Sequence, residues 1–286
     1  MKKFKGSGVA MVTPFHADKS IDYDGLERVI EHVITGGIDY LVVQGTTGET
    51  ATLSSSEKKE VLAFSIKSNR GRLPIVYGIG GNHTQALLDE IEATDFSGVD
   101  AILSVSPYYN KPTQEGIIAH YETVADASPV PVILYNVPGR TMSNLRADTT
   151  LTLSEHPNII GVKESSGNLE QCIQIAAKKK DDFLLISGDD MLATAMRAIG
   201  GQGIISVMAN AYPAIFKTII HGDQEESMKA TYRLLNINPL MYTESNPVGI
   251  KNLMKHLGLC GDEVRLPLLK ASEALDQKIK EASFKV

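Results

Sequence analysis

Eight short apolar runs recur along the chain, and the segments between them are longer and amphipathic. Apolar runs that are rich in β-branched residues and bounded by turn residues predict buried strands. The predicted strands span residues 8–12, 40–44, 74–78, 101–105, 132–135, 159–163, 183–187 and 203–207. Helical patterns between them include residues 24–34, 54–67, 84–96 and 171–179. This alternation predicts parallel strands that are joined by helical crossovers.

Eight strand–helix units are the number that closes a parallel sheet into a (β/α)8 TIM barrel. An open, doubly wound sheet is the alternative, but it leaves two exposed edges and usually has fewer strands. We therefore predict an α/β barrel domain over residues 1–211, followed by a C-terminal helical region over residues 212–286. A length of 286 residues would also fit two domains, yet no Pro/Ser-rich linker or low-complexity segment divides the chain.

The composition argues against several classes of partner. The net charge is −6, and the longest basic run, residues 178–180, is followed directly by two aspartates, so we expect no nucleic acid. No apolar stretch approaches the length of a membrane span, and the chain starts without a secretory signal pattern. We expect a cytoplasmic protein with Cys172 and Cys260 as reduced thiols. The seven histidines form no zinc-type pair, so no metal is expected.

Lys163 ends the sixth predicted strand and precedes a loop rich in serine and glycine. Active sites in barrels of this kind lie at the carboxyl ends of the strands. Burial of an ammonium is costly, and a desolvated lysine amine that has lost its proton is a nucleophile toward carbonyl groups. The position therefore indicates Schiff-base chemistry without a metal. The alternative is a lysine that extends out of the strand end into water.

Three other rim positions suit such chemistry. Tyr135 ends the fifth strand beside Lys163 and could exchange protons, although strand-end tyrosines are often amphipathic rim residues. Thr46 and Thr47 lie in a Gly-Thr-Thr-Gly turn whose N–H groups could bind a carboxylate, unless it is only a tight turn. The Arg140 guanidinium suits a bidentate carboxylate, with a surface salt bridge as the alternative.

Two further patterns are interpreted as structural. Asp189 and Asp190 resemble an acid or metal pair, but no other group pairs with them, so we predict that they cap a helix N-terminus. Residues 78–83 resemble a dinucleotide fingerprint but lack its third glycine. No dinucleotide, and no other cofactor, is therefore predicted.

Four motifs occur together and in order: Gly-Thr-Thr-Gly-Glu at residues 45–49, Ser-Pro-Tyr-Tyr-Asn-Lys-Pro at 106–112, Tyr-Asn-Val-Pro-Gly-Arg at 135–140 and Gly-Val-Lys-Glu-Ser-Ser-Gly at 161–167. With them the chain resembles the 4-hydroxy-tetrahydrodipicolinate (dihydrodipicolinate) synthase family of pyruvate-dependent class I aldolases, which include N-acetylneuraminate lyase. The resemblance covers nearly the whole chain, through Asn246-Pro247.

The resemblance implies condensation of pyruvate with L-aspartate 4-semialdehyde, the first committed step of diaminopimelate and lysine biosynthesis. Arg140 favours this small carboxylate-bearing aldehyde, because the sugar-acid lyases do not show the Tyr-Asn-Val-Pro-x-Arg pattern. Two alternatives remain open. One is a related aldolase or lyase that releases pyruvate from a longer 2-keto acid, and the other is a non-enzymatic barrel that serves for binding.

The resemblance also implies roles for single residues. Lys163 would form the Schiff base, Tyr135 would be the acid/base, and Thr46 with Tyr109 would complete a proton relay. Tyr109 would reach the site of a neighbouring subunit, so a dimer would be the working unit and a homotetramer of two dimers is expected.

Residues that bind the two substrates follow from the same resemblance. Thr47 and the backbone around Ile205 and Gly188 would hold pyruvate. Arg140 would take the carboxylate of the semialdehyde.

One departure from the family concerns feedback inhibition by lysine. Members that lysine inhibits carry His, His and Glu at the positions of Ser55, Lys58 and Ala86, whereas Asn82 and Tyr108 do match. A lysine ligand would lose the carboxylate that pairs with its α-amino group. We therefore predict weak or absent inhibition by lysine.

Overall fold

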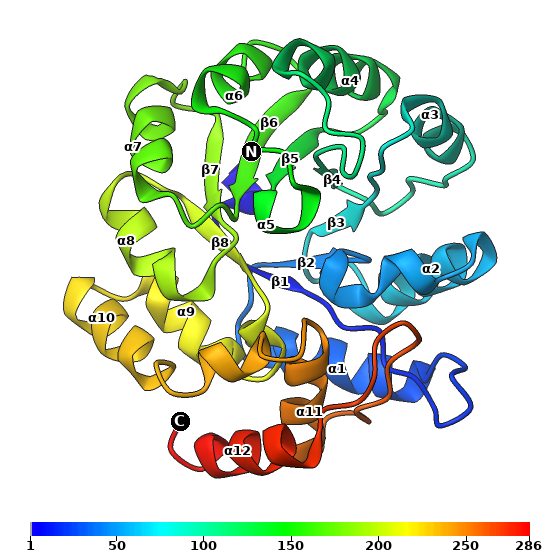
Figure 1. Cartoon of the computed structure of the whole chain (residues 1–286), viewed down its shortest axis with the longest axis vertical. Coiled ribbons are helices and arrows are strands. Elements are labelled where there is room, and N and C mark those ends of the chain that lie inside the picture. Colours follow the sequence, from blue (N-terminus) through cyan, green and yellow to red (C-terminus); the bar gives the residue numbers. More distant parts are fainter. Residues whose placement is uncertain (1) are drawn as a thin grey trace.

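Eight parallel strands form a closed barrel at the centre of the molecule (Figure 1). The computed structural model describes residues 2–286. Each strand pairs with the next along the chain, and β8 closes the barrel on β1. The strands are β1 Gly6–Ala10, β2 Tyr40–Val43, β3 Ile75–Gly78, β4 Ala101–Val105, β5 Val132–Asn136, β6 Ile159–Glu164, β7 Leu184–Ser187 and β8 Gly203–Ser206. The predicted TIM barrel is confirmed.

The predicted strand limits differ from the observed ones in two instructive places. β1 begins and ends two residues earlier than expected, because Gly6 already pairs with Gly203. Met11 and Val12 are buried beyond the end of the strand, so the apolar run there marks burial and not the sheet ladder. β5 and β6 each continue one residue further than predicted, since Asn136 and Glu164 still pair across the two strands.

Helices surround the barrel (Figure 1). They are α1 Tyr23–Thr35, α2 Ser55–Asn69, α3 Thr84–Glu92, α4 Gln114–Ala127, α5 Pro138–Thr141, α6 Ala147–Leu153, α7 Leu169–Lys178, α8 Ala193–Ala198, α9 Pro213–His221, α10 Gln224–Arg233, α11 Val248–His256 and α12 Glu273–Ser283. A capping box starts α2, with Ser54 and Glu57 each bonding the other's backbone. Thr113 caps α4 through the N–H of Gly116.

The core has two layers, because strands of a parallel sheet are buried on both faces. Val42, Ile133 and Ile186 belong to the cluster inside the barrel. A larger cluster fills the space between the strands and the helix ring, with Val162 and Ile175 among its members. The interior of the barrel is thus filled with side chains and not hollow, so a site can form only at its ends.

The C-terminal region is helical, as predicted. α9 contacts β1 and β8 and so completes the helix ring, whereas α11 packs against α12. These contacts favour counting α9 with the barrel, and the division at residue 211 stays a prediction. Within residues 2–286, no helix combines the length and apolar character that a membrane crossing requires.

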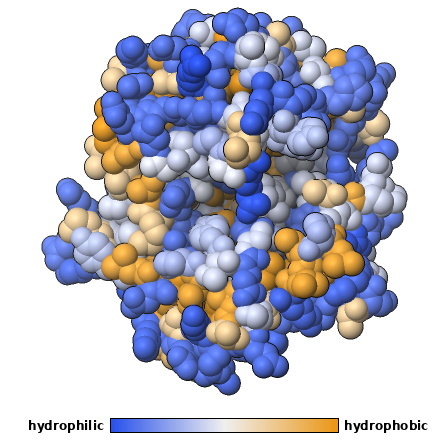
Figure 2. Space-filling model, viewed as in Figure 1, coloured by the Kyte–Doolittle hydropathy of each residue, from blue (hydrophilic) through white to orange (hydrophobic). Residues whose placement is uncertain are grey.

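Large apolar side chains are exposed in the loop between α11 and α12. Leu266 and Leu269 are 75% and 72% exposed, and Figure 2 shows apolar residues gathered near this loop on the face in view. Both cysteines are buried free thiols. Cys172 lies in α7, and Cys260 lies in a bend after α11.

Candidate active site

Lys163 and Tyr135 lie side by side at the carboxyl end of the barrel. The register of β5 and β6 places them directly opposite one another. The Lys163 side chain is buried, with the residue 5% exposed, and its Nζ lies 4.3 Å from the centre of the Tyr135 ring. None of the ion pairs found among residues 2–286 includes this amine. The barrel therefore presents a buried amine beside a phenol.

The loop after β2 brings two hydroxyl groups to the same end. Thr46–Gly48 forms one 3-10 turn, η2, which Gly48 closes through a hydrogen bond from its N–H to the Gly45 carbonyl at 3.0 Å. The Thr13 hydroxyl donates to the carbonyl of Gly48 at 2.8 Å. The Thr47 hydroxyl accepts from Nδ2 of Asn246 at 3.0 Å. The turn is thus held by contacts from outside it.

Arg140 lies at the mouth of the barrel. β5 runs almost directly into α5, and Pro138 occupies the first turn of this short helix, where its missing N–H has no consequence. The exposed Arg140 donates from Nη2 to the carbonyl of Asn246 at 3.4 Å. A guanidinium so placed can meet a carboxylate that enters the barrel.

A cavity of about 280 Å³ joins these groups. Six of the eight predicted site residues line it: Thr46, Thr47, Tyr135, Arg140, Lys163 and Gly188. A second cavity of about 570 Å³ adjoins it and shares Thr46, Tyr135 and Arg140. The two form one cleft that leads from Lys163 to the surface.

Two of the predicted residues lie away from this cavity. Tyr109 is 87% exposed and lines neither part of the cleft. Its backbone has a φ of 73°, a left-handed conformation that is uncommon for an aromatic residue. Ile205 is fully buried on β8 inside the barrel. Their expected roles stay predictions.

Several polar residues that the sequence did not predict as site residues line the same cavity. Three of them carry a buried oxygen atom without a hydrogen-bond partner within residues 2–286: Ser165, Asn238 and Asn246. Asn238 and Asn246 come from the C-terminal region, where the local pattern indicates only helices. The motif around Asn246-Pro247 was the one signal available. Unpaired buried oxygens are costly, so these atoms are suited to hydrogen-bond a ligand.

The prediction for the aspartate pair is half right. Asp189 caps η4 (Asp190–Leu192) by accepting from the N–H of Met191 at 3.0 Å. Asp190 does not cap it, because its side chain is buried and accepts from the N–H of Met208 at 3.0 Å. Burial raises the pKa of Asp190 to about 6. Among residues 2–286, no three His, Cys, Asp or Glu side chains are grouped to hold a metal ion.

The buried carboxylate of Glu164 forms hydrogen bonds at the carboxyl ends of β5 and β6. Glu164, next to Lys163, accepts from Asn136 Nδ2 at 3.0 Å, from Gln171 Nε2 at 2.9 Å and from the N–H of Ser166 at 2.8 Å. Asn136 directly follows Tyr135. The Asn136–Glu164 bond therefore links the residues that follow the amine and the phenol and fixes the two strands in register.

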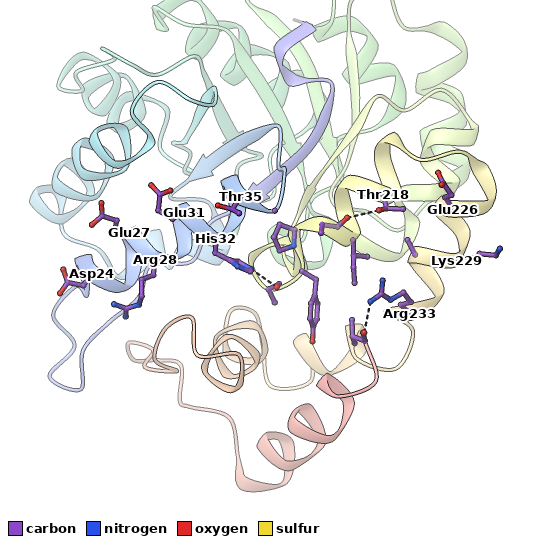
Figure 3. Close-up of a pocket in the computed structure, with 18 residues that line it drawn as sticks. Asp24, Glu27, Arg28, Glu31, His32, Thr35, Thr218, Glu226, Lys229 and Arg233 are labelled. Atoms are coloured by element: carbon purple, nitrogen blue, oxygen red, sulfur yellow. Dashed lines mark hydrogen bonds between the residues drawn. The ribbon is translucent and has the colours of Figure 1, made fainter.

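A larger cavity lies elsewhere. It is a groove of about 1360 Å³ between α1 and the α9–α10 pair, lined by none of the predicted site residues (Figure 3). Figure 3 shows charged side chains along it, among them Glu31 of α1 and Arg233 of α10, which donates to the carbonyl of Val286 at 3.0 Å. The buried amine and the phenol, Lys163 and Tyr135, lie instead at the barrel mouth, which is therefore the candidate active site.

Comparison with known proteins places this chain in a family. Residues 3–284 match the Dihydrodipicolinate synthetase family. The 4-hydroxy-tetrahydrodipicolinate synthase of Cytophaga hutchinsonii is 49% identical, over 100% of this chain and 98% of that protein. Among solved structures, the dihydrodipicolinate synthase of Aquifex aeolicus has a TM-score of 0.94 at 37% identity, covering 99% of this chain and 98% of that one. The lysine-bound enzyme of Cyanidioschyzon merolae has a TM-score of 0.95 at 34% identity, with coverage of 99% and 98%.

Proposed function

The chain belongs to the dihydrodipicolinate synthetase family, and on this premise we propose that Lys163 is the residue that forms the Schiff base. The reaction is that of 4-hydroxy-tetrahydrodipicolinate synthase, in which pyruvate is condensed with L-aspartate 4-semialdehyde through a lysine Schiff base. It is the first committed step of diaminopimelate and lysine biosynthesis. The observation that supports the role of Lys163 best is its buried Nζ, 4.3 Å from the centre of the Tyr135 ring.

Schiff-base formation needs proton transfer in both directions. The neutral Lys163 amine attacks the keto carbon of pyruvate, and the carbinolamine then loses water to give an iminium. The Tyr135 phenol is the group that gives and takes these protons, with the Thr46 hydroxyl as the next member of the relay. Tyr109 completes the relay from a neighbouring subunit.

The carbon–carbon bond forms next. The iminium withdraws electrons, so the methyl carbon of pyruvate loses a proton and the adduct becomes an enamine. The enamine attacks the aldehyde carbon of the second substrate. The amino group of that substrate then displaces Lys163 and closes the ring, with one water released overall and the enzyme amine restored.

The carboxylates of the two substrates are held at different places. Thr47 and the N–H groups of its turn bind the pyruvate carboxylate, together with the backbone around Gly188 and Ile205. Arg140, at the mouth, binds the carboxylate of the semialdehyde. This separation orients the aldehyde carbon toward the enamine.

The working enzyme is proposed to be a homotetramer built from two dimers. The exposed Tyr109, which lines no part of its own cleft, and the exposed Leu266 and Leu269 support association between copies of the chain. The two free thiols agree with action in the cytoplasm, where cysteines stay reduced. Sedimentation velocity measures the assembly directly, and a monomer at micromolar concentration would contradict it.

Trapping tests the role of Lys163. The enzyme is incubated with pyruvate and borohydride, and mass spectrometry of its peptides should find the reduced adduct on Lys163. A folded enzyme without an adduct on this residue would overturn the proposal. Turnover of pyruvate with L-aspartate 4-semialdehyde, coupled to the reductase that consumes the product, then tests the complete reaction. Pyruvate release from a longer 2-keto acid in place of this turnover would indicate a lyase.

A further inference from the structure

A buried ion pair lies directly behind the substrate turn. Glu49 follows Thr46–Gly48, and its carboxylate binds the ammonium of Lys251, which lies on α11. Their side chains are 2% and 0% exposed, respectively. Neither residue lines the Lys163 cavity, although Glu49 borders the adjoining second cavity, and the chemistry described above uses neither. A pair so deeply buried needs a reason, because removal of two charges from water is costly.

Both partners are completely surrounded. Lys251 Nζ also donates to the carbonyl of Glu263 at 2.8 Å and lies 4.1 Å from the centre of the Phe15 ring. The second oxygen of Glu49 accepts from the N–H of Arg265 at 3.0 Å. Each charge thus has partners on more than one side, and the geometry of the pair is fixed.

The conformation of the turn explains why it needs such an anchor. Glu49 has a φ of 54°, in the left-handed region, and separates η2 from a second 3-10 turn, η3 (Thr50–Thr52). Single 3-10 turns have weak internal hydrogen bonding. The position of Thr46 and Thr47 therefore depends on contacts from elsewhere in the chain.

The contacts of the turn come largely from one distant segment. Asn246 donates to the Thr47 hydroxyl at 3.0 Å, and Lys251, about one turn further along the chain, binds Glu49. Asn246 also accepts from Arg140 through its carbonyl. Asn246, just before α11, thus contacts a residue of each proposed carboxylate site.

Resting on the proposed function, we infer that Lys251 and Glu49 are positioning residues that hold the Thr46–Thr47 turn in its catalytic position. The pair acts through the turn and does not touch the substrates. If either partner is lost, the other is left with an unpaired charge in a buried place, and this favours a shift of the turn that carries Glu49. A shift of about 1 Å at a reacting group can lower the rate by roughly 10²-fold.

The test compares Lys251→Met, Glu49→Gln and the double variant with the wild-type enzyme. Methionine keeps the length of lysine, glutamine keeps the shape of glutamate, and the double variant carries no unpaired charge. Lys255→Met is the matched control, because Lys255 lies on the same helix, is half-exposed and pairs with Asp262. The measured quantities are Tm, kcat, the KM for each substrate and the rate of the borohydride-trapped adduct.

A positioning role predicts different effects on the kinetic constants and on Tm. The single variants should lose at least about 10-fold in kcat and in trapping rate, and their KM for pyruvate should rise while the KM for the semialdehyde changes less than 2-fold. The double variant should regain most of the lost Tm but not the lost kcat. Lys255→Met should keep wild-type kinetics.

The opposite results are equally clear. If kcat returns together with Tm in the double variant, the pair serves stability alone and the inference is wrong. Should Lys251→Met not fold, Glu49→Gln and the double variant carry the same comparison. The wild-type trapping reaction tests the Schiff-base role of Lys163 separately from the positioning role of the Lys251–Glu49 pair. If no adduct forms on the wild-type enzyme, the Schiff-base role is wrong, and the positioning role is still tested by Tm and kcat.

Discussion

The two sides of the active-site mouth are built in different ways. Lys163 and Tyr135 lie on neighbouring strands, where the register of β5 and β6 sets their positions and the Asn136–Glu164 bond supports them from behind. The Thr47 hydroxyl, in the turn after β2, is instead held by Asn246 of the C-terminal region, at a sequence separation of 199. The strand side is thus determined locally, whereas the loop side depends on long-range contacts.

The largest effect should come from the strand side. Lys163→Met removes the nucleophile and keeps a side chain of similar length, so kcat should fall on the order of 10³-fold, about 4 kcal/mol in transition-state stabilisation. The borohydride adduct should disappear. Tm should not fall, because methionine can keep the contact with the Tyr135 ring and no longer requires burial of an ammonium. Lys178→Met, on the exposed part of α7, is the control. A variant that keeps full turnover would show that another residue carries the covalent step.

Removal of the phenol proton should have the next largest effect. Tyr135→Phe keeps the ring that faces Lys163 and deletes only the hydroxyl, so the packing is unchanged. General acid–base groups contribute typically 10² to 10⁴ in rate, and we expect kcat to fall about 10²-fold with a slower appearance of the trapped adduct. Tyr232→Phe, at an exposed position on α10, is the control. An unchanged rate of adduct formation would assign the proton transfer elsewhere.

A smaller effect is expected where the loop side meets the C-terminal region. Asn246→Ala removes the hydrogen bond to Thr47 and leaves the backbone carbonyl that Arg140 contacts. One hydrogen bond is worth about 1 kcal/mol, so the KM for pyruvate should rise about 5-fold. Steady-state kinetics with each substrate varied in turn provide the measurement. A rise confined to the semialdehyde would mean that Asn246 acts through Arg140.

The same contrast explains what the sequence could predict. The barrel followed from eight alternating units, and the neighbouring positions of Tyr135 and Lys163 followed from the order of the strands, because both are short-range regularities. The recruitment of Asn238 and Asn246 could not be predicted from local patterns, since it depends on how the C-terminal helices fold back over the mouth. Hydrophobic periodicity likewise does not predict which side chains a distant element covers.

The contact of Asp190, after the end of β7, also could not be predicted from the local sequence pattern. A polar pair before a short helix is typical of N-caps, and Asp189 behaves so, but the contact of Asp190 with Met208 depends on the position of the segment after β8. β1 was misplaced by two residues for a related reason, since apolar runs record burial and not the start of pairing. Strand order is therefore predictable here, and the contacts of the loops are not.

A fourth prediction concerns this buried aspartate and stability. The carboxyl of Asp190 has a pKa of about 6 in the folded chain, above the usual 3.8. Between about pH 4 and pH 6 the folded state therefore binds a proton that the unfolded state has released, and the free energy of unfolding contributed by this group falls as the pH rises. Asp190→Asn should remove this pH dependence. Relative to wild type, the free energy of unfolding of the variant should be about 1–3 kcal/mol higher at pH 7.5 than at pH 4. Urea unfolding at both values measures it, and a difference that is independent of pH would contradict the assignment.

The smallest expected effect is the response to lysine. In the second part of the cleft, Lys58 and Tyr108 line the wall, and Lys58 Nζ pairs with Glu90 at 3.2 Å. An ammonium already occupies this wall, and Ala86 offers no carboxylate to a second one. We therefore expect less than 2-fold inhibition at lysine concentrations that inhibit other family members.

Ala86→Glu sharpens this last prediction. Ala86 is exposed on α3, so a glutamate there should fold normally. A charge-assisted hydrogen bond to the α-amino group of lysine is worth about 1.5–3 kcal/mol, so the affinity for lysine should rise by roughly 10-fold or more. Calorimetric titration with lysine measures the gain, and Gln85→Glu, one residue away on the helix, is the control. Strong inhibition of the wild-type enzyme would mean that the Lys58–Glu90 pair opens to admit the ligand, so that the loop side can rearrange without damage to the strand side.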